Sequence, residues 1–310
     1  MDEQPTDGTP GTPGESPIGT DAADDPDAAV TPAAAEPVLE TRASRRARRE
    51  AGRARPELSP EALALRPFVV ITTVALSALL ILGVVTDPVL LAACLGLTTL
   101  VLAWGWPRLL GSSSRFGSSL AIGVTGLLTA AATAIVTEQP YLRLVPVALA
   151  AGLGLMFGHQ IVRRDGRPRL TESIGVTSFG LALVALGSAW MPLSRSWRAT
   201  DLAVVAFVAI AVSSLADLAL AYPRMRAWVL PMAMVLGGAS GLVAAAVAGS
   251  PGPATAALAG LVVAAVALAL RRALTVLPGV GSVQGQVAAG SAGLLAPGVV
   301  AYGLALLFVG

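Results

Sequence analysis

The sequence predicts an all-α, polytopic integral membrane protein with about nine transmembrane helices and a disordered N-terminal tail. Hydrophobic residues make up 55% of the 310 residues and charged residues only 13%, a balance that exceeds what a water-soluble fold can bury. From Phe68 onward, apolar runs near the ~20 residues that span hydrocarbon alternate with short polar connections. Arginine is concentrated in every second connection, as in a chain that crosses a membrane repeatedly.

Three regions follow from composition. Residues 1–41 form an acidic tail, because the first forty hold ten acids and no arginine and are rich in Pro, Ala, Thr and Gly, which predicts a disordered cytoplasmic segment. Residues 42–66 carry eight arginines against three glutamates and form a juxtamembrane linker. We expect this linker to meet anionic lipid headgroups, at ~1 kcal/mol for each arginine. Residues 67–310 form the transmembrane domain.

Helices are expected for every span, because lipid forces the backbone to satisfy its hydrogen bonds internally, and no alternating strand pattern occurs. The predicted spans are 67–85, 89–106, 117–136, 144–162, 171–191, 202–221, 227–248, 254–270 and 287–309. Pro146, Pro231 and Pro297 lie inside these spans and are positioned to kink or break them. The eighth span is the weakest, because it is short and ends in an arginine pair.

Arginine predicts the orientation. With the tail in the cytoplasm, 18 of the 21 arginines fall on cytoplasmic segments, which agrees with the positive-inside rule over five consecutive inner segments. An odd number of spans then places the C-terminus outside. All five tryptophans lie at predicted helix ends, as in an aromatic belt. We therefore expect a plasma (inner) membrane protein of a bacterium.

The densest polar stretch links the fourth and fifth spans. His159 and Arg163 share a helix face, as do Gln160 and Arg164. One interpretation is a headgroup site at the inner leaflet, because clustered arginines gather phosphate and a histidine can exchange a proton. The other is an ordinary positive-inside loop with a histidine at the interface. The proposed site residues here are His159, Arg163, Arg164, Arg167, Arg169 and Glu172.

Asp217 is the one carboxylate well inside a predicted span, about five residues from its end. Ser213 and Ser214 lie one turn earlier and are expected to hydrogen-bond it. Because burying an ionisable group in a membrane is costly, such a group is a functional candidate. We hypothesise that Asp217 converges with His159, Arg163 and Glu172 in one inner-leaflet cluster. The alternative is a structural hydrogen bond or ion pair between helices.

Small residues crowd the seventh and ninth spans, including Gly237, Gly241 and Gly290, and small side chains let helix backbones approach closely in lipid. We expect one such face to bind another membrane protein. The single cysteine, Cys94, allows no disulfide within the chain, and it reads as a small core residue.

The sequence has few side chains of the kinds that carry catalysis or bind a cofactor. The chain has no lysine, which excludes a Schiff-base lysine and a lysine-bearing phosphate loop, and it has a single histidine. We expect no catalytic residue, no cofactor, no metal and no nucleic-acid partner. The function that remains is a non-enzymatic scaffold or accessory subunit of an envelope-assembly or transport machine. A transporter or lipid translocator using the inner-leaflet site is the first alternative, and a lipid-modifying membrane enzyme is the second.

Overall fold

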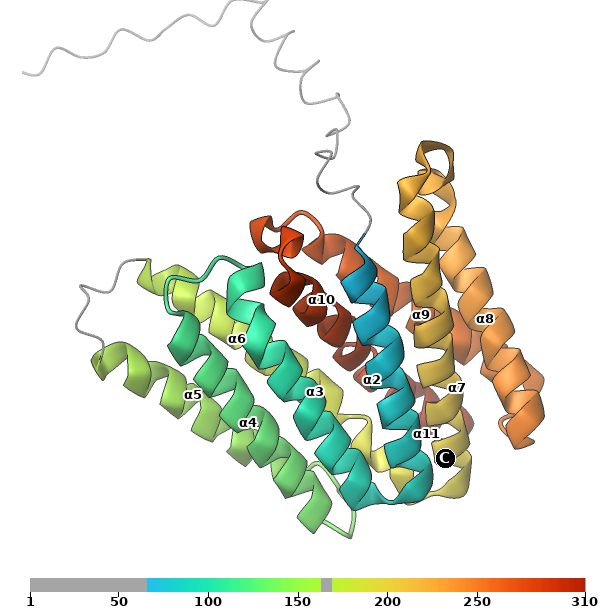
Figure 1. The fold of residues 1–310 in the computed structure, drawn as a ribbon. Helices are drawn as coiled ribbons and strands as arrows, with labels where there is room; N and C mark the ends of the chain where they lie inside the picture. Colours follow the sequence, from blue (N-terminus) through green and yellow to red (C-terminus); the bar gives the residue numbers. More distant parts are fainter. Residues whose placement is uncertain (1–65, 163–168, 310) are drawn as a thin grey trace, which may run out of the picture. The chain divides into compact units, whose positions relative to one another are not determined.

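The computed structural model describes residues 66–162 and 169–309, and every regular element in them is helical (Figure 1). The α-helices are α2 (Pro67–Thr86), α3 (Pro88–Leu109), α4 (Arg115–Ile135), α5 (Val145–Val162), α6 (Leu170–Ser188), α7 (Trp197–Ser214), α8 (Val229–Ala248), α9 (Pro253–Leu274), α10 (Val283–Leu295) and α11 (Gly298–Phe308). Shorter 3₁₀ helices are η2 (Met191–Arg195), η3 (Leu215–Ala221), η4 (Pro223–Trp228) and η5 (Pro278–Gly281). The acidic tail and all of the linker except Arg66 lie outside the described residues.

These described residues hold nine helical segments long and apolar enough to cross a membrane, which confirms the predicted multi-pass architecture. The eighth span, expected to be the weakest, is the regular 22-residue helix α9. The ninth is broken at Ala296–Pro297 into α10 and α11, because proline lacks the N–H that would continue the helical hydrogen bonds.

Helix boundaries follow the local sequence. Proline is the first residue of α2, α3 and α9, where its missing N–H would have no helical partner. Asp87 caps α3 by accepting a hydrogen bond from the Val89 amide, and Ser282 caps α10 through the Gly285 amide. Gly249 ends α8 with a φ of +80°, a left-handed conformation that glycine adopts without strain.

The helices pack so that α3 contacts α2, α4 and α10, whereas α7 contacts α2, α8 and α9. Helix α5 packs only against α4 and α6 among its main neighbours, and Figure 1 shows α4 and α5 side by side at one edge of the helical region. The inner core is built from large side chains that are fully buried, including Leu80, Leu102, Trp106, Ile122, Trp190 and Phe207.

The small-residue face of α8 is used within the chain. A Cβ on Gly237 would lie 2.6 Å from the Gly260 carbonyl oxygen and 2.4 Å from the Ala264 Cβ, both on α9. A Cβ on Gly241 would lie 2.8 Å from the Ala256 carbonyl oxygen on the same helix. The expectation that this glycine face binds another protein is therefore wrong for these residues, because α9 already covers them.

The tryptophans divide into two groups. Trp104, Trp197 and Trp228 are exposed on the helical surface, as an aromatic belt requires. Trp106 and Trp190 are fully buried, and their indole N–H groups donate to the carbonyls of Val176 (2.9 Å) and Leu294 (3.1 Å). The aromatic-belt interpretation is thus wrong for these two, because position at a helix end does not say whether the side chain faces lipid or a neighbouring helix.

Candidate functional site: an arginine cluster around Asp217

Most buried hydroxyl groups in the described spans are satisfied by their own helix. Thr73, Thr98, Thr125 and Thr129 each donate to the carbonyl four residues earlier, at 2.6 to 2.8 Å. Such a hydroxyl has no hydrogen left to donate to a neighbouring helix or a ligand, because it already donates to its own helix. The polar groups that reach between helices are therefore the informative ones.

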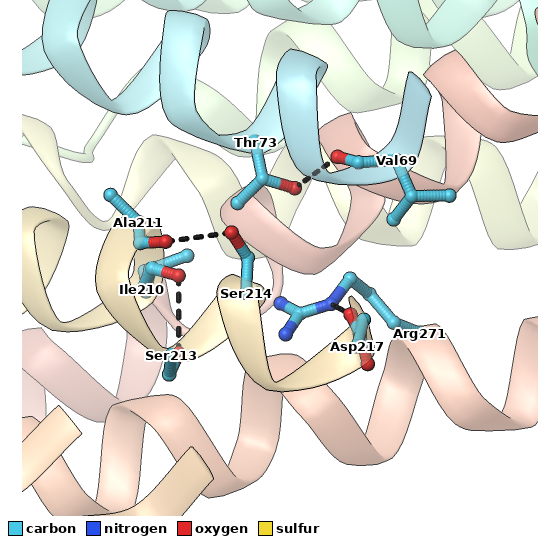
Figure 2. A network of polar contacts seen from close by, with 8 residues as sticks. All are labelled: Val69, Thr73, Ile210, Ala211, Ser213, Ser214, Asp217 and Arg271. Carbon is cyan, nitrogen blue, oxygen red and sulfur yellow. Dashed lines mark hydrogen bonds and ion pairs between the residues drawn. The ribbon is translucent and has the colours of Figure 1, made fainter. Parts of the chain in front are cut away.

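Asp217 forms an ion pair with Arg271, and the pair joins η3 to α9 (Figure 2). The Arg271 Nε donates to the Asp217 Oδ2 at 2.9 Å, and the two side chains are 2% and 12% exposed. The stem of Arg271 crosses α10 at Gly293, where a Cβ would lie 2.8 Å from the Arg271 Cγ. A glycine at position 293 therefore makes room for this arginine.

The expected partners of Asp217 within its own helix bind elsewhere. Ser213 donates to the Ile210 carbonyl at 3.1 Å and Ser214 to the Ala211 carbonyl at 2.6 Å (Figure 2). That expectation is wrong, because a serine in a helix finds a carbonyl one turn back on its own backbone. Asp217 instead lies in the first turn of η3, the tighter 3₁₀ segment that follows α7, and it pairs with Arg271 on α9.

Two further arginines surround this pair. Arg66, at the start of α2, donates from Nη2 to the Thr275 carbonyl at 3.3 Å, and it is near enough to Asp217 and Arg272 to interact with their charges. Burial and the neighbouring Arg272 both lower the pKa of Arg66, whereas Asp217 opposes them. All four residues line one cavity of about 20 Å³ together with Thr275. We call Arg66, Arg271, Arg272 and Asp217 the arginine cluster.

Arg271 is incompletely satisfied. Its Nη1 and Nη2 are buried and have no hydrogen-bond partner in the described part of the chain, and the same is true of the Asp217 Oδ1. Native proteins leave few buried polar atoms unsatisfied, so each such atom calls for an explanation. Two donors on one fully buried guanidinium point to an acceptor that comes from outside these residues.

His159 occupies a separate polar cluster between α4, α5 and α6. Its Nε2 lies 3.1 Å from the Ser114 Oγ, and its ring packs on Gly117, where a Cβ would lie 2.0 Å from the imidazole. One residue further on, Gln160 donates to the Ser173 Oγ at 2.9 Å. These contacts tie the ends of three neighbouring helices together.

Glu172 pairs locally. Its Oε2 lies 2.5 Å from the Nε of Arg169, three residues earlier, and the two side chains are 31% and 65% exposed. Arg169 itself has a left-handed backbone (φ 54°) just before α6. The other three predicted arginines, Arg163, Arg164 and Arg167, lie outside the described residues.

Among the predicted site residues that the structure describes, Asp217 therefore does not meet His159 and Glu172 in one cluster. His159 pairs with Ser114 at the start of α4 and Glu172 with Arg169 just before α6, whereas Asp217 pairs with Arg271 on α9. The sequence indicates how deep a residue lies along its span, but it does not indicate which helices are neighbours. Helix α5 packs against α4 and α6, whereas η3 packs against α2, α7 and α8. Equal depth did not imply contact, so the hypothesis of convergence is wrong for His159, Glu172 and Asp217, whereas Arg163 lies outside the described residues.

Sequence reasoning missed Arg66, Arg271 and Arg272 as site residues, because arginines flanking a span are explained by topology alone. One signal was present: Asp217 and the arginine pair both sit near the end of a span predicted to finish on the same side. A carboxylate and an arginine at matched depth can pair across helices, and pairing lowers the cost of burying both.

A second, larger cavity lies at the opposite ends of the helices. It measures about 390 Å³ and is lined by residues that include Tyr141, Arg195, Trp197 and Tyr302. Arg195 binds the end of α4, since its Nη2 donates to the carbonyls of Thr133 (2.9 Å) and Val136 (3.0 Å). Its guanidinium also lies over the Tyr141 ring, 5.4 Å from the centroid.

The described residues contain no group of three or more His, Cys, Asp and Glu side chains placed to hold a metal ion. The fold and the clusters define the class as a multi-pass, all-α membrane protein with ionic contacts at the ends of its helices. Comparisons with protein families, with curated proteins and with solved structures find no match.

Proposed function

We propose that this chain is a non-enzymatic, multi-pass component of a membrane assembly: a scaffold or accessory subunit of a bacterial envelope-assembly or transport machine. The observation that carries the proposal is how polar groups are distributed in the spans. Threonine hydroxyls along α2, α3 and α4 bond to their own helices, and the Asp217–Arg271 pair lies at the helix ends. Transport sites usually lie near the midplane.

The proposal includes a location and an orientation. A plasma-membrane protein with its N-terminus in the cytoplasm and its C-terminus outside is supported by the arginines that flank the helices. Arg108 lies in the last turn of α3 and Arg115 is the first residue of α4. Arg224 and Arg226 lie in η4, and Arg272 lies in the last turn of α9. Under this orientation all five are on the cytoplasmic side.

The exposed surface fits a scaffold. Large apolar side chains point outward on helices at different places in the fold, including Ile71, Val162, Val247 and Leu307. Lipid covers such residues by default, and a partner helix uses the same chemistry. A scaffold differs from a lipid-surrounded monomer because one of these faces is held against a defined protein.

Site-specific photocrosslinking in cells tests the proposal. A photoreactive residue is placed in turn at Ile71, Val162, Val247 and Leu307, each on a different helix. We expect a protein adduct of one defined mass from one face or from two neighbouring faces, and lipid adducts from the others. The adduct should persist in a His159→Ala background. Lipid adducts alone at all four positions would contradict the scaffold.

A lipid translocator is the second candidate, and the arginine cluster favours it. Three arginines around one carboxylate at the end of a span offer a place to receive an anionic headgroup. Reconstituted protein should then move a fluorescent anionic lipid between leaflets, and Arg272→Gln should slow this movement. Equal rates in vesicles with and without protein would exclude translocation.

A further inference from the structure

The arginine cluster carries more positive charge than its own residues neutralise. Arg271 and Arg272 alone contribute two positive charges, and Asp217 contributes one negative charge. Guanidinium groups stay protonated in proteins, so deprotonation cannot remove the surplus. Arg271 is 2% exposed, and Arg66 and Arg272 are only partly exposed. Burying a surplus of charge is costly, and a bound anion offsets that cost.

We propose that the arginine cluster is a binding site for one phosphate group, with Arg271 at its base and Arg66 and Arg272 at its mouth. The phosphate is carried either by the headgroup of an anionic lipid or by a small soluble phosphate. The site holds in a scaffold and in a translocator alike, so the inference goes beyond the proposed function and does not rest on it.

The geometry of Arg271 supports an external acceptor. A guanidinium has five N–H donors in a planar fork, and the Arg271–Asp217 contact uses Nε alone. Both terminal nitrogens are then left without a partner, and Figure 2 shows this end of the guanidinium turned away from Asp217 toward Ser214. Asp217 therefore acts as a positioning residue, since it holds the arginine while leaving two donors for another group.

The size of the cavity sets how the phosphate fits. A volume of about 20 Å³ holds roughly one oxygen atom with its hydrogens, the size of a water molecule. One phosphoryl oxygen enters this space, and the rest of the group stays outside near Arg66 and Arg272. Val69, Leu220, Val280 and Ala289 form apolar walls, and charge interactions are stronger beside such walls than in water.

Binding of both phosphate sources to the full chain tests the site. The protein is placed in nanodiscs of phosphatidylcholine alone, or of phosphatidylcholine mixed with phosphatidic acid, and retained lipid is counted by native mass spectrometry. Separately, millimolar inorganic phosphate is added to lipid-depleted protein in detergent. Thermal unfolding is followed by total tryptophan fluorescence, which changes when the buried Trp106 and Trp190 become exposed. Retention of phosphatidic acid alone assigns a lipid headgroup, whereas stabilisation by inorganic phosphate assigns a soluble ligand.

The variants avoid the ion pair, because Arg271→Gln would leave Asp217 without its partner. Arg66→Gln and Arg272→Gln each remove one positive charge from the mouth, and Arg224→Gln removes one from the exposed η4 segment as the matched control. We expect each mouth variant to weaken phosphate binding about tenfold or more, the effect of losing one charged hydrogen bond, and the control by less than about twofold.

Two results would overturn the proposal. The first is that neither phosphatidic acid nor inorganic phosphate binds to the folded wild-type chain. The second is that binding falls equally in Arg272→Gln and Arg224→Gln, which would indicate general attraction to a positive surface. In both cases the unsatisfied Arg271 nitrogens would be assigned to bound water.

Discussion

Asp217 and Arg271 form an ion pair at 2.9 Å although 54 residues separate them in the sequence. The pair joins η3 to α9, so it fixes the end of α7 against the end of the eighth span. With only 12% of its side chain exposed, Asp217 faces protein and not lipid. The same contact explains why a carboxylate is tolerated inside a span and why Arg271 can be fully buried.

Removing either member of this pair should destabilise the protein, but not equally. In Asp217→Asn, the buried Arg271 keeps its charge but loses the carboxylate it pairs with, so we expect a loss of about 3–5 kcal/mol. In Arg271→Met, Asp217 keeps the charges of Arg66 and Arg272 nearby, so the loss should be smaller. Thermal unfolding in detergent, converted to free energies with a denaturant unfolding series, checks which of the two variants loses more stability. A smaller loss of stability in Asp217→Asn than in Arg271→Met would mean that the excess positive charge does not destabilise the fold.

This asymmetry also changes what an activity assay on Asp217→Asn can mean. A variant that unfolds cannot report on a coupling site, so membrane level and unfolding temperature must be measured beside any activity. Arg224→Gln serves as the control for charge alone, because Arg224 is exposed and lies in the neighbouring η4 segment.

The spans were predictable from the sequence because lipid imposes one demand on every segment that crosses it. Each must be apolar, long and helical, and Pro297 breaks the ninth span where proline chemistry requires it. Helix neighbours were not predictable in this way. Which helix contacts which depends on packing surfaces of Gly, Ala and Val, and one such surface looks much like another in sequence. The pairing of Asp217 with α9 therefore needed coordinates.

The contact between α8 and α9 should be sensitive to one methyl group. Gly237→Ala places a Cβ against the Gly260 carbonyl and the Ala264 methyl, and neither can swing away as the tip of a long side chain would. We expect a loss of about 1–3 kcal/mol from overpacking. Gly154→Ala on α5 is the control, since a Cβ there meets no atom within 4 Å. Equal stability of the two variants would show that α8 and α9 are not in close contact.

Because the His159 ring packs directly on Gly117, we expect His159→Ala to reduce the destabilisation caused by Gly117→Ala. Gly117→Ala should push the imidazole away from Ser114 and cost about 1 kcal/mol, the net contribution of one hydrogen bond. His159→Ala should cost a similar amount. Combined, the two changes should cost less than the sum of the separate effects, because the new methyl group then faces the emptied site.

A double-mutant cycle measures this coupling by thermal unfolding. Gly175→Ala on α6 replaces Gly117→Ala in a parallel cycle, because its Cβ would stand in open space. Additive effects in the Gly117 cycle would mean that the ring does not occupy the position above the glycine, and that the packing between α4 and α5 needs revision.

Accessibility of single cysteines tests the orientation on which the cytoplasmic placement of the arginine cluster depends. In a Cys94→Ala background, Glu138→Cys places a thiol on the exposed α4–α5 connection, and Ala227→Cys places one in the exposed η4 segment. Arg224 and Arg226 flank position 227, and translocating arginines across a bacterial membrane is disfavoured. We therefore expect a membrane-impermeant maleimide to label Glu138→Cys in intact cells and Ala227→Cys only after the cells are broken. The reverse pattern would place the arginine cluster on the outer face, where it could not meet a cytoplasmic phosphate or an inner-leaflet headgroup.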